Sequence, residues 1–144
     1  MNYKEIIEKM YEEDREFNQF IPPPATEDEI AQLKKDFQAE FSFPLPEFYC
    51  DILRITNGLN FNGLTIWPTR AYGPIPFSLI EENRDSHLNG WDEYLYFANL
   101  DADRYVYNLE TKEYQLVDFA GHSLVEVFPT CKEMLEDALR RAYN

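Results

Sequence analysis

The stretch that decides the fold runs from Leu45 to Trp67 and reads LPEFYCDILRITNGLNFNGLTIW. Pro46 suits the first turn of a helix, because the missing N–H would be unpaired there and the proline φ is already helical. Apolar residues then recur at spacings of three and four, which predicts a helix with one wide buried face, made of Phe48, Tyr49, Ile52, Leu53 and Ile55. Asn57-Gly58 is expected to end this helix, since glycine readily adopts the left-handed conformation that satisfies the last carbonyls.

A hairpin is predicted immediately after this helix. Apolar and polar residues alternate over 59–61, and Asn62-Gly63 supplies the two positive φ angles of a type I′ turn before Leu64, Ile66 and Trp67. The stretch therefore joins a helical first third of the chain to a β-rich remainder. It holds no reacting group in a catalytic setting, so it specifies a scaffold rather than a chemistry.

Four features of this stretch carry a family resemblance: the Leu45-Pro46 helix start, Tyr49 one turn in, Asn57-Gly58 at the helix end, and Trp67. In this order they resemble the SUKH superfamily, which includes fungal cell-wall-synthesis regulators and bacterial immunity proteins that neutralise secreted toxins. The resemblance extends over the upstream helix, the aromatic-rich strands to about Asp118 and the final helix. It implies a protein-binding role, and its motif residues are structural ones that name no ligand.

The chain has 144 residues, 27 of them acidic and 13 basic, which gives a formal net charge of −14. Its length fits one domain, residues 1–144, that can bury a core without disulfides or metal. Such a charge repels phosphate backbones and anionic lipid, so we expect neither a nucleic-acid nor a membrane partner. It favours fast, salt-sensitive association with a basic partner, although excess acid can also serve solubility alone.

The two cysteines, Cys50 and Cys131, lie far apart in the chain and outside any Cys-x-x-Cys pair. Neither a disulfide framework nor a zinc site is therefore indicated, and a reducing compartment fits best. Residues 1–10 are charged throughout and lack the apolar run of a signal peptide. No segment is long and apolar enough to span a bilayer. These features predict a cytoplasmic protein.

Four more helices are predicted from periodicity and capping. Residues 2–18 form an amphipathic pattern with an apolar face of Tyr3, Ile6, Ile7, Met10 and Phe17. A stiff connector, Pro22–Pro24, separates this helix from one that opens with the capping box Thr26–Glu29. The same capping pattern recurs at Ser78–Glu81 and at Thr130–Glu133, where the last helix begins.

The region after residue 93 is β in character. Short runs rich in Tyr, Phe and Val occupy residues 94–98, 104–108 and 113–118, with polar loops at 99–103 and 109–112 and a further strand expected at 124–127. Together with the Asn62-Gly63 hairpin they predict an antiparallel sheet of about four to six strands. The fold class is therefore α+β, with the sheet packed by N-terminal helices and a C-terminal helix.

No motif for nucleophilic catalysis stands out. Cys50 lies among apolar residues and reads as a small buried hydrophobe. Cys131 falls in the first turn of a helix, where a thiolate could be stabilised, but no catalytic signature surrounds it. A Cys-His enzyme would have to use His87 or His122 as its base, and neither lies in a recognisable motif. We therefore predict that the protein is not an enzyme.

Cofactor and metal motifs are also missing from the sequence. Asp101-Ala102-Asp103 starts like a calcium loop, but Tyr105 and Val106 stand where a third oxygen ligand and the glycine are needed, so this segment reads as a solvated turn. The glycines are scattered singly, which excludes a phosphate-binding loop. We expect no cofactor and no metal.

Two functional classes remain. The first is a stoichiometric binding protein, most concretely an immunity protein that occludes a basic, nuclease-like toxin domain, as the SUKH resemblance implies. The second is a regulatory or scaffolding module for an endogenous partner. Neither reading fixes the oligomeric state.

The predicted interface is an acidic surface rather than a pocket. Its residues lie on the long irregular connection of residues 68–93 and in the loops beside the sheet, because long connections in compact domains often carry function. Trp91 is included as an aromatic anchor. The predicted residues are Glu81, Glu82, Asp85, Trp91, Asp92, Glu93, Asp101 and Asp103.

Overall fold

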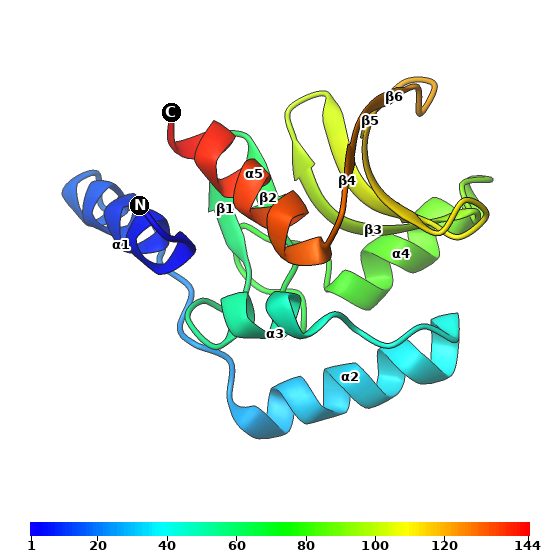
Figure 1. Ribbon diagram of the computed structural model, residues 1–144. Coiled ribbons are helices and arrows are strands. Elements are labelled where there is room, and N and C mark those ends of the chain that lie inside the picture. The colour runs from blue at the N-terminus through cyan, green and yellow to red at the C-terminus, as the bar shows by residue number, and fades with distance from the viewer.

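The computed structural model describes residues 1–144 and has five helices and one six-stranded antiparallel sheet, which confirms the predicted α+β class. The helices are α1 (Tyr3–Glu16), α2 (Glu27–Phe41), α3 (Glu47–Leu53), α4 (Leu79–Leu88) and α5 (Cys131–Tyr143). The strands are β1 (Leu59–Phe61), β2 (Leu64–Ile66), β3 (Tyr94–Leu100), β4 (Asp103–Asn108), β5 (Glu113–Asp118) and β6 (Leu124–Phe128). Figure 1 shows α1 next to α5, α4 next to β3, and α2 below α3.

The sheet is a meander in which each strand pairs with the next one along the chain, in the order β1-β2-β3-β4-β5-β6. β2 and β3 are neighbours although residues 67–93, including α4, separate them in sequence. All the predicted strands are present, within the predicted range of four to six. β3 runs on to Leu100 and β4 starts at Asp103, so Asp101-Ala102 alone forms the turn, rather than the predicted loop 99–103.

Helices α4 and α5 lie on opposite faces of the sheet. Consecutive residues of a strand point to opposite faces. In β4, Arg104 forms an ion pair with Glu82 of α4 at 2.6 Å, whereas Tyr105 donates a hydrogen bond to the Asp137 carboxylate of α5 at 2.9 Å. The sheet is therefore the middle layer at β3 and β4, and α1 packs against the outer side of α5.

The Leu45–Trp67 stretch forms α3 and the β1–β2 hairpin. Asn62 and Gly63 have φ angles of 50° and 87°, which confirms the predicted turn. The predicted helix end is wrong, because α3 stops at Leu53, two residues before Ile55 of the predicted helical face and four before Asn57. The Asn57 side chain accepts a hydrogen bond from the Thr69 N–H at 2.8 Å, so it ties the chain after α3 to the chain after β2.

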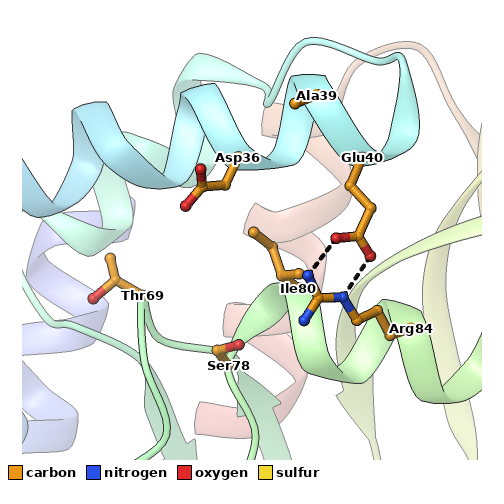
Figure 2. Close-up of a pocket in the computed structure, with 7 residues that line it drawn as sticks. All are labelled: Asp36, Ala39, Glu40, Thr69, Ser78, Ile80 and Arg84. Atoms are coloured by element: carbon orange, nitrogen blue, oxygen red, sulfur yellow. Dashed lines mark hydrogen bonds and ion pairs between the residues drawn. The ribbon is translucent and has the colours of Figure 1, made fainter.

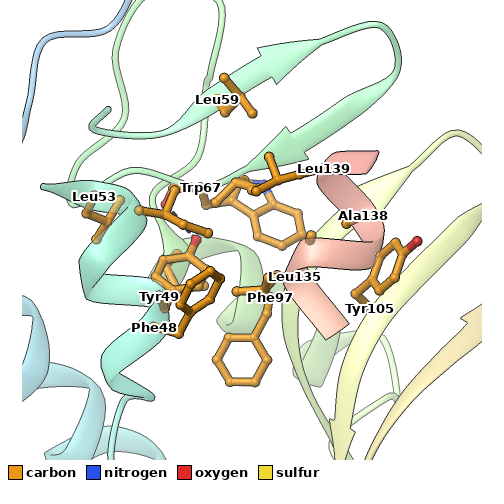
Figure 3. Packing of buried hydrophobic residues seen from close by; sticks show 14 of the residues in the cluster. Phe48, Tyr49, Leu53, Leu59, Trp67, Phe97, Tyr105, Leu135, Ala138 and Leu139 are labelled. Carbon is orange, nitrogen blue, oxygen red and sulfur yellow. Dashed lines mark hydrogen bonds between the residues drawn. The ribbon is translucent and has the colours of Figure 1, made fainter. Parts of the chain in front are cut away.

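The core is one cluster of 36 buried residues that includes side chains from every helix and every strand. Figure 3 shows Tyr49 of α3, Phe97 of β3 and Leu135 of α5 converging between these elements. Tyr49 is fully buried and donates a hydrogen bond from its hydroxyl to the Trp67 carbonyl oxygen at 2.6 Å. The residues that carry the family resemblance are thus core residues that hold α3 against the hairpin.

Two local predictions are not met. Phe17 lies just past the end of α1 and is 64% exposed, so it is not part of the buried face. At Thr130 only half of the capping box forms. The Thr130 hydroxyl accepts the Glu133 N–H at 3.1 Å, but the Thr130 N–H makes no hydrogen bond to the Glu133 carboxylate. The boxes at Thr26 and Ser78 are complete.

None of the five helices combines the length and the apolar composition that a membrane crossing requires.

Candidate functional site

Helix α4 carries three of the predicted interface residues in two different environments. Ser78 caps the helix, because its hydroxyl accepts the Glu81 N–H at 3.1 Å while the Glu81 carboxylate accepts the Ser78 N–H at 2.9 Å. Glu81 and Asp85 are exposed and form no ion pair. Glu82 instead faces the sheet and pairs with Arg104, with 13% of its side chain exposed. The helix therefore presents two carboxylates without an ion pair to solvent rather than three, and of these only that of Asp85 also makes no hydrogen bond.

The remaining predicted acids lie at the two ends of β3. Asp92 and Glu93 precede the strand and are exposed, while Asp101 and the half-buried Asp103 follow it. The seven residues of β3 separate these two groups by roughly 20 Å. None of the four carboxylates forms an ion pair. The predicted residues are therefore spread along β3 rather than gathered into one compact patch.

A further acid, Asp118, lies near the acids of the β3–β4 turn and is not among the predicted interface residues. Asp118, at the end of β5, lies directly opposite Asp103 in the ladder. Its carboxylate accepts the Gly121 N–H at 2.8 Å, and this backbone hydrogen bond lowers the pKa of Asp118. Like charges placed opposite one another destabilise a sheet, so this end of the sheet carries a concentrated negative charge at some cost in stability. The sequence signal that could have identified Asp118 is that one predicted strand ends in an Asp and the strand before it begins next to another, Asp103.

A polar pocket of about 330 Å³ lies between α4, β4 and the loop that joins β5 to β6. Arg104 lines it, and its guanidinium pairs with Glu82, donates from Nε to the Asn99 Oδ1 at 3.0 Å, and sits 4.0 Å from the centre of the Tyr96 ring. Burial raises the pKa of Glu82, while the nearby Arg104 acts in the opposite direction. This ion pair joins α4 to the sheet.

The wall of this pocket is formed by Trp91 and His122. Their rings stack with centroids 3.7 Å apart, and Trp91 is half-buried. The His122 Nε2 lies 3.0 Å from the Tyr96 hydroxyl, and its buried Nδ1 has no hydrogen-bond partner. Burial, and then the charge of Arg104, lowers the pKa of His122, so the ring is neutral near pH 7. Trp91 is therefore part of a packed aromatic group and only partly available as an anchor.

Sequence reasoning did not assign Arg104 or His122 to a binding site. A whole strand, β5, separates them in the chain, and they line one pocket only because the β5–β6 loop folds back toward α4. The groups of this pocket can hold a polar side chain or a small polar molecule through hydrogen bonds. Three of the predicted interface residues, Glu82, Asp85 and Trp91, also line it.

A second hollow of about 500 Å³ lies between α2 and α4 (Figure 2). Arg84 of α4 and Glu40 of α2 reach across it and form two hydrogen bonds, at 2.6 and 2.5 Å. Bidentate pairs of this kind fix geometry as well as charge. This contact ties α4 to α2, and Arg84 forms its ion pair with Glu40 rather than with an exposed carboxylate of α4.

Comparison with known proteins places the chain in a family. No curated protein matches it. The model of the SMI1 / KNR4 family (SUKH-1) matches residues 24–137, which run from the start of α2 into α5 and include the hairpin, the sheet and both pockets. This match confirms the resemblance carried by Tyr49, Asn57-Gly58 and Trp67. The chain therefore belongs to the SMI1 / KNR4 family (SUKH-1).

Proposed function

We propose that this protein is a non-catalytic immunity protein that neutralises a basic, nuclease-like toxin domain by binding and occluding it. Membership in the SUKH-1 family supports a toxin-immunity or protein-binding role at the level of the family. The observation that carries the proposal is a set of accessible carboxylates that no basic side chain neutralises, namely Glu81, Asp85, Asp92, Glu93, Asp101 and Asp103. We refer to these six residues as the acidic surface.

The placement of positive charge explains why the acidic surface stays unneutralised. Only three basic residues occur between positions 81 and 118: Arg84, Arg104 and Lys112. Arg84 is bound to Glu40, and Arg104 is bound to Glu82. With Lys112 the only other basic residue of this region, the six carboxylates leave an excess of negative charge there, which would steer the basic groove of a partner toward it and accelerate association at low salt.

The state of the thiols supports a mechanism of blockade rather than covalent chemistry. Both cysteines are buried. Burial raises the pKa of Cys50 to about 11 and raises the pKa of Cys131 as well. The thiolate is the nucleophilic form of cysteine, so at neutral pH neither thiol is prepared for attack.

The proposal is tested by mixing the purified protein with the toxin domain encoded by the gene immediately upstream, where a large secreted protein with a variable C-terminal domain is expected. Occlusion predicts complete loss of toxicity at an equimolar ratio and an on-rate that falls as salt rises. Protection by a trace of the protein would mean turnover and would overturn the proposal. Metabolic neighbours in place of a toxin gene would favour the regulatory or scaffolding alternative.

The role of the acidic surface is tested separately with Asp85→Lys/Asp92→Lys. Neither side chain makes a hydrogen bond or ion pair, so the double variant should fold normally and bind the toxin more weakly, mainly through a slower on-rate. Glu13→Lys/Glu16→Lys on α1 is the matched control, because it makes the same change in net charge with exposed residues on another helix. Equal effects of the two variants would show that only the overall charge matters.

A further inference from the structure

A third pocket, of about 220 Å³, lies where the end of α1 and the chain after it meet β1 and the loop before α4. Its polar residues are Asp14, Gln19 and Asn60, and none of them belongs to the acidic surface. The wall made by residues 14–22 precedes residue 24, where the family match begins. The pocket therefore combines a part of the chain inside the family match with a part outside it.

Asp14 is a buried carboxylate that the protein leaves without a partner. The residue is 9% exposed, and its carboxylate makes no hydrogen bond and no ion pair. Its oxygens are not sealed off, because the only enclosed and unpaired polar side-chain atom of the protein is the His122 Nδ1. The pocket that Asp14 lines gives access to them. Aspartates this buried are normally paired, so the missing partner points to a ligand.

The surroundings of Asp14 disfavour its negative charge. Asp14 lies in the last turn of α1, at the negative end of the helix dipole. The adjacent basic residue, Arg15, forms its ion pair with Glu8 at 3.3 Å. Burial, and then the charge of Glu13, raises the pKa of Asp14. A bound cation would supply the counter-charge that the chain itself does not provide.

The other polar groups of the pocket indicate the kind of cation. The Gln19 Nε2 donates a hydrogen bond to the Phe17 carbonyl oxygen at 3.3 Å, which leaves the Gln19 Oε1 as a free acceptor. The Asn60 side chain is exposed on β1 and makes no hydrogen bond, so its Oδ1 is free as well. Together with the Asp14 carboxylate, these oxygens match the three N–H donors of a primary ammonium group.

The remaining walls are suited to an apolar stem. Pro22 and Ile75 are buried apolar residues, and Phe20 is a half-exposed aromatic ring that can also contact a cation with its face. A metal ion fits less well, because hard cations prefer several oxygen ligands with more than one carboxylate. No group of three His, Cys, Asp or Glu residues that could hold a metal occurs in the protein.

We propose that this pocket binds a primary alkylammonium group, with Asp14 as its counter-ion and the Gln19 and Asn60 side-chain oxygens as further acceptors. A free amine and a lysine side chain of another protein present the same chemistry, an ammonium group on an apolar stem. The proposal goes beyond toxin binding and does not depend on it, because it uses other residues and is tested with the purified chain alone.

The probe is n-butylamine, titrated into the ¹⁵N-labelled full chain at pH 7 and constant ionic strength, with ¹H–¹⁵N correlation spectra as the readout. Saturable shifts are expected at the backbone amides of Gln19 and Asn60. n-Butanol, which has the same stem without the charge, should produce no saturable shift at the same concentrations. A second probe, N-acetyl-lysine amide, distinguishes the sources: binding as tight as that of n-butylamine assigns the pocket to lysine side chains, and binding of n-butylamine alone assigns it to free amines.

Asp14→Asn should weaken binding of n-butylamine about tenfold or more, because it removes a hydrogen bond to a charged acceptor. Its thermal midpoint should stay the same or rise, since an unfavourable buried charge is lost. Glu13→Gln is the matched control, because it makes the same change in net charge at the exposed, unpaired neighbour, and it should bind as the wild type does. Asn60→Ala removes only an exposed side chain and should weaken binding about twofold to tenfold.

Three outcomes would overturn the proposal. The first is a wild type without saturable shifts at Gln19 and Asn60. The second is binding of n-butanol as tight as that of n-butylamine, since the pocket would then recognise the stem and not the charge. The third is equal weakening by D14N and E13Q, because the amine would then respond only to the overall charge of the protein.

Discussion

Replacing Arg104 with methionine should lower the free energy of unfolding by about 3–5 kcal/mol, the cost of breaking a buried ion pair by removing one partner. The Arg104 side chain is 7% exposed, and it binds Glu82 at 2.6 Å and Asn99 at 3.0 Å. Methionine keeps an apolar stem against Tyr96 and removes the guanidinium, so the loss reports the charge left on Glu82 rather than a cavity. A loss of this size is a large fraction of the roughly 5–15 kcal/mol that stabilises a typical domain.

The pH dependence of this variant has a definite sign. Burial already raises the pKa of Glu82, and Arg104 is the chief group that opposes this rise. Without Arg104 the folded-state pKa rises further above the unfolded value of about 4.3. Between those two pKa values the folded protein binds the proton more tightly than the unfolded one, so the stability of R104M falls as pH rises through this window. The deficit against wild type should therefore be largest near neutral pH and smallest below pH ~4.

Urea unfolding followed by far-UV circular dichroism, at neutral and mildly acidic pH, measures both effects. Arg140→Met is the matched control, because Arg140 is exposed and unpaired on α5, and its cost should stay within about 0.5 kcal/mol. The double variant Glu82→Leu/Arg104→Met should recover much of the loss, since no charge is then left buried. A cost for R104M below about 1 kcal/mol, or a cost that does not change with pH, would refute the reasoning.

Three further predictions concern the fold. Gly58→Ala should destabilise more than Gly90→Ala. Both glycines have positive φ, which costs an alanine about 1–2 kcal/mol, but only at Gly58 would a Cβ press on buried atoms, those of Pro68 at 3.0 Å and Ile75 at 3.1 Å. Thermal unfolding of the two variants measures the difference. Tyr49→Phe should cost about 0.5–1.5 kcal/mol in urea unfolding, because it removes the buried hydrogen bond to Trp67. Cys50 should resist iodoacetamide in the native protein at pH 7 and react in denaturant, because its pKa is about 11; rapid native labelling, detected by mass spectrometry, would contradict this.

The candidate site shows where sequence reasoning reaches its limit. The sequence identified Glu81, Asp85, Asp92 and Glu93 as acids on a connection and beside strands, and the structure places them at the surface without ion pairs. Glu82 looks identical to Glu81 in sequence, yet it points into the sheet and binds Arg104. Which of two adjacent helical carboxylates is free depends on where α4 docks, and local periodicity does not contain that information.

The sequence by itself determined the elements of this protein. Apolar spacing, the capping residues Thr26 and Ser78, and the Asn62-Gly63 turn are local signals, and local backbone preferences act over a few residues, so the helices, the hairpin and the α+β class follow from them. Only the tertiary structure decided that β6 is left at an open edge and that Arg104 and His122 share a pocket. Those outcomes depend on strand order and on which residues meet across the sheet, and long-range contacts of this kind leave no periodic trace in one sequence.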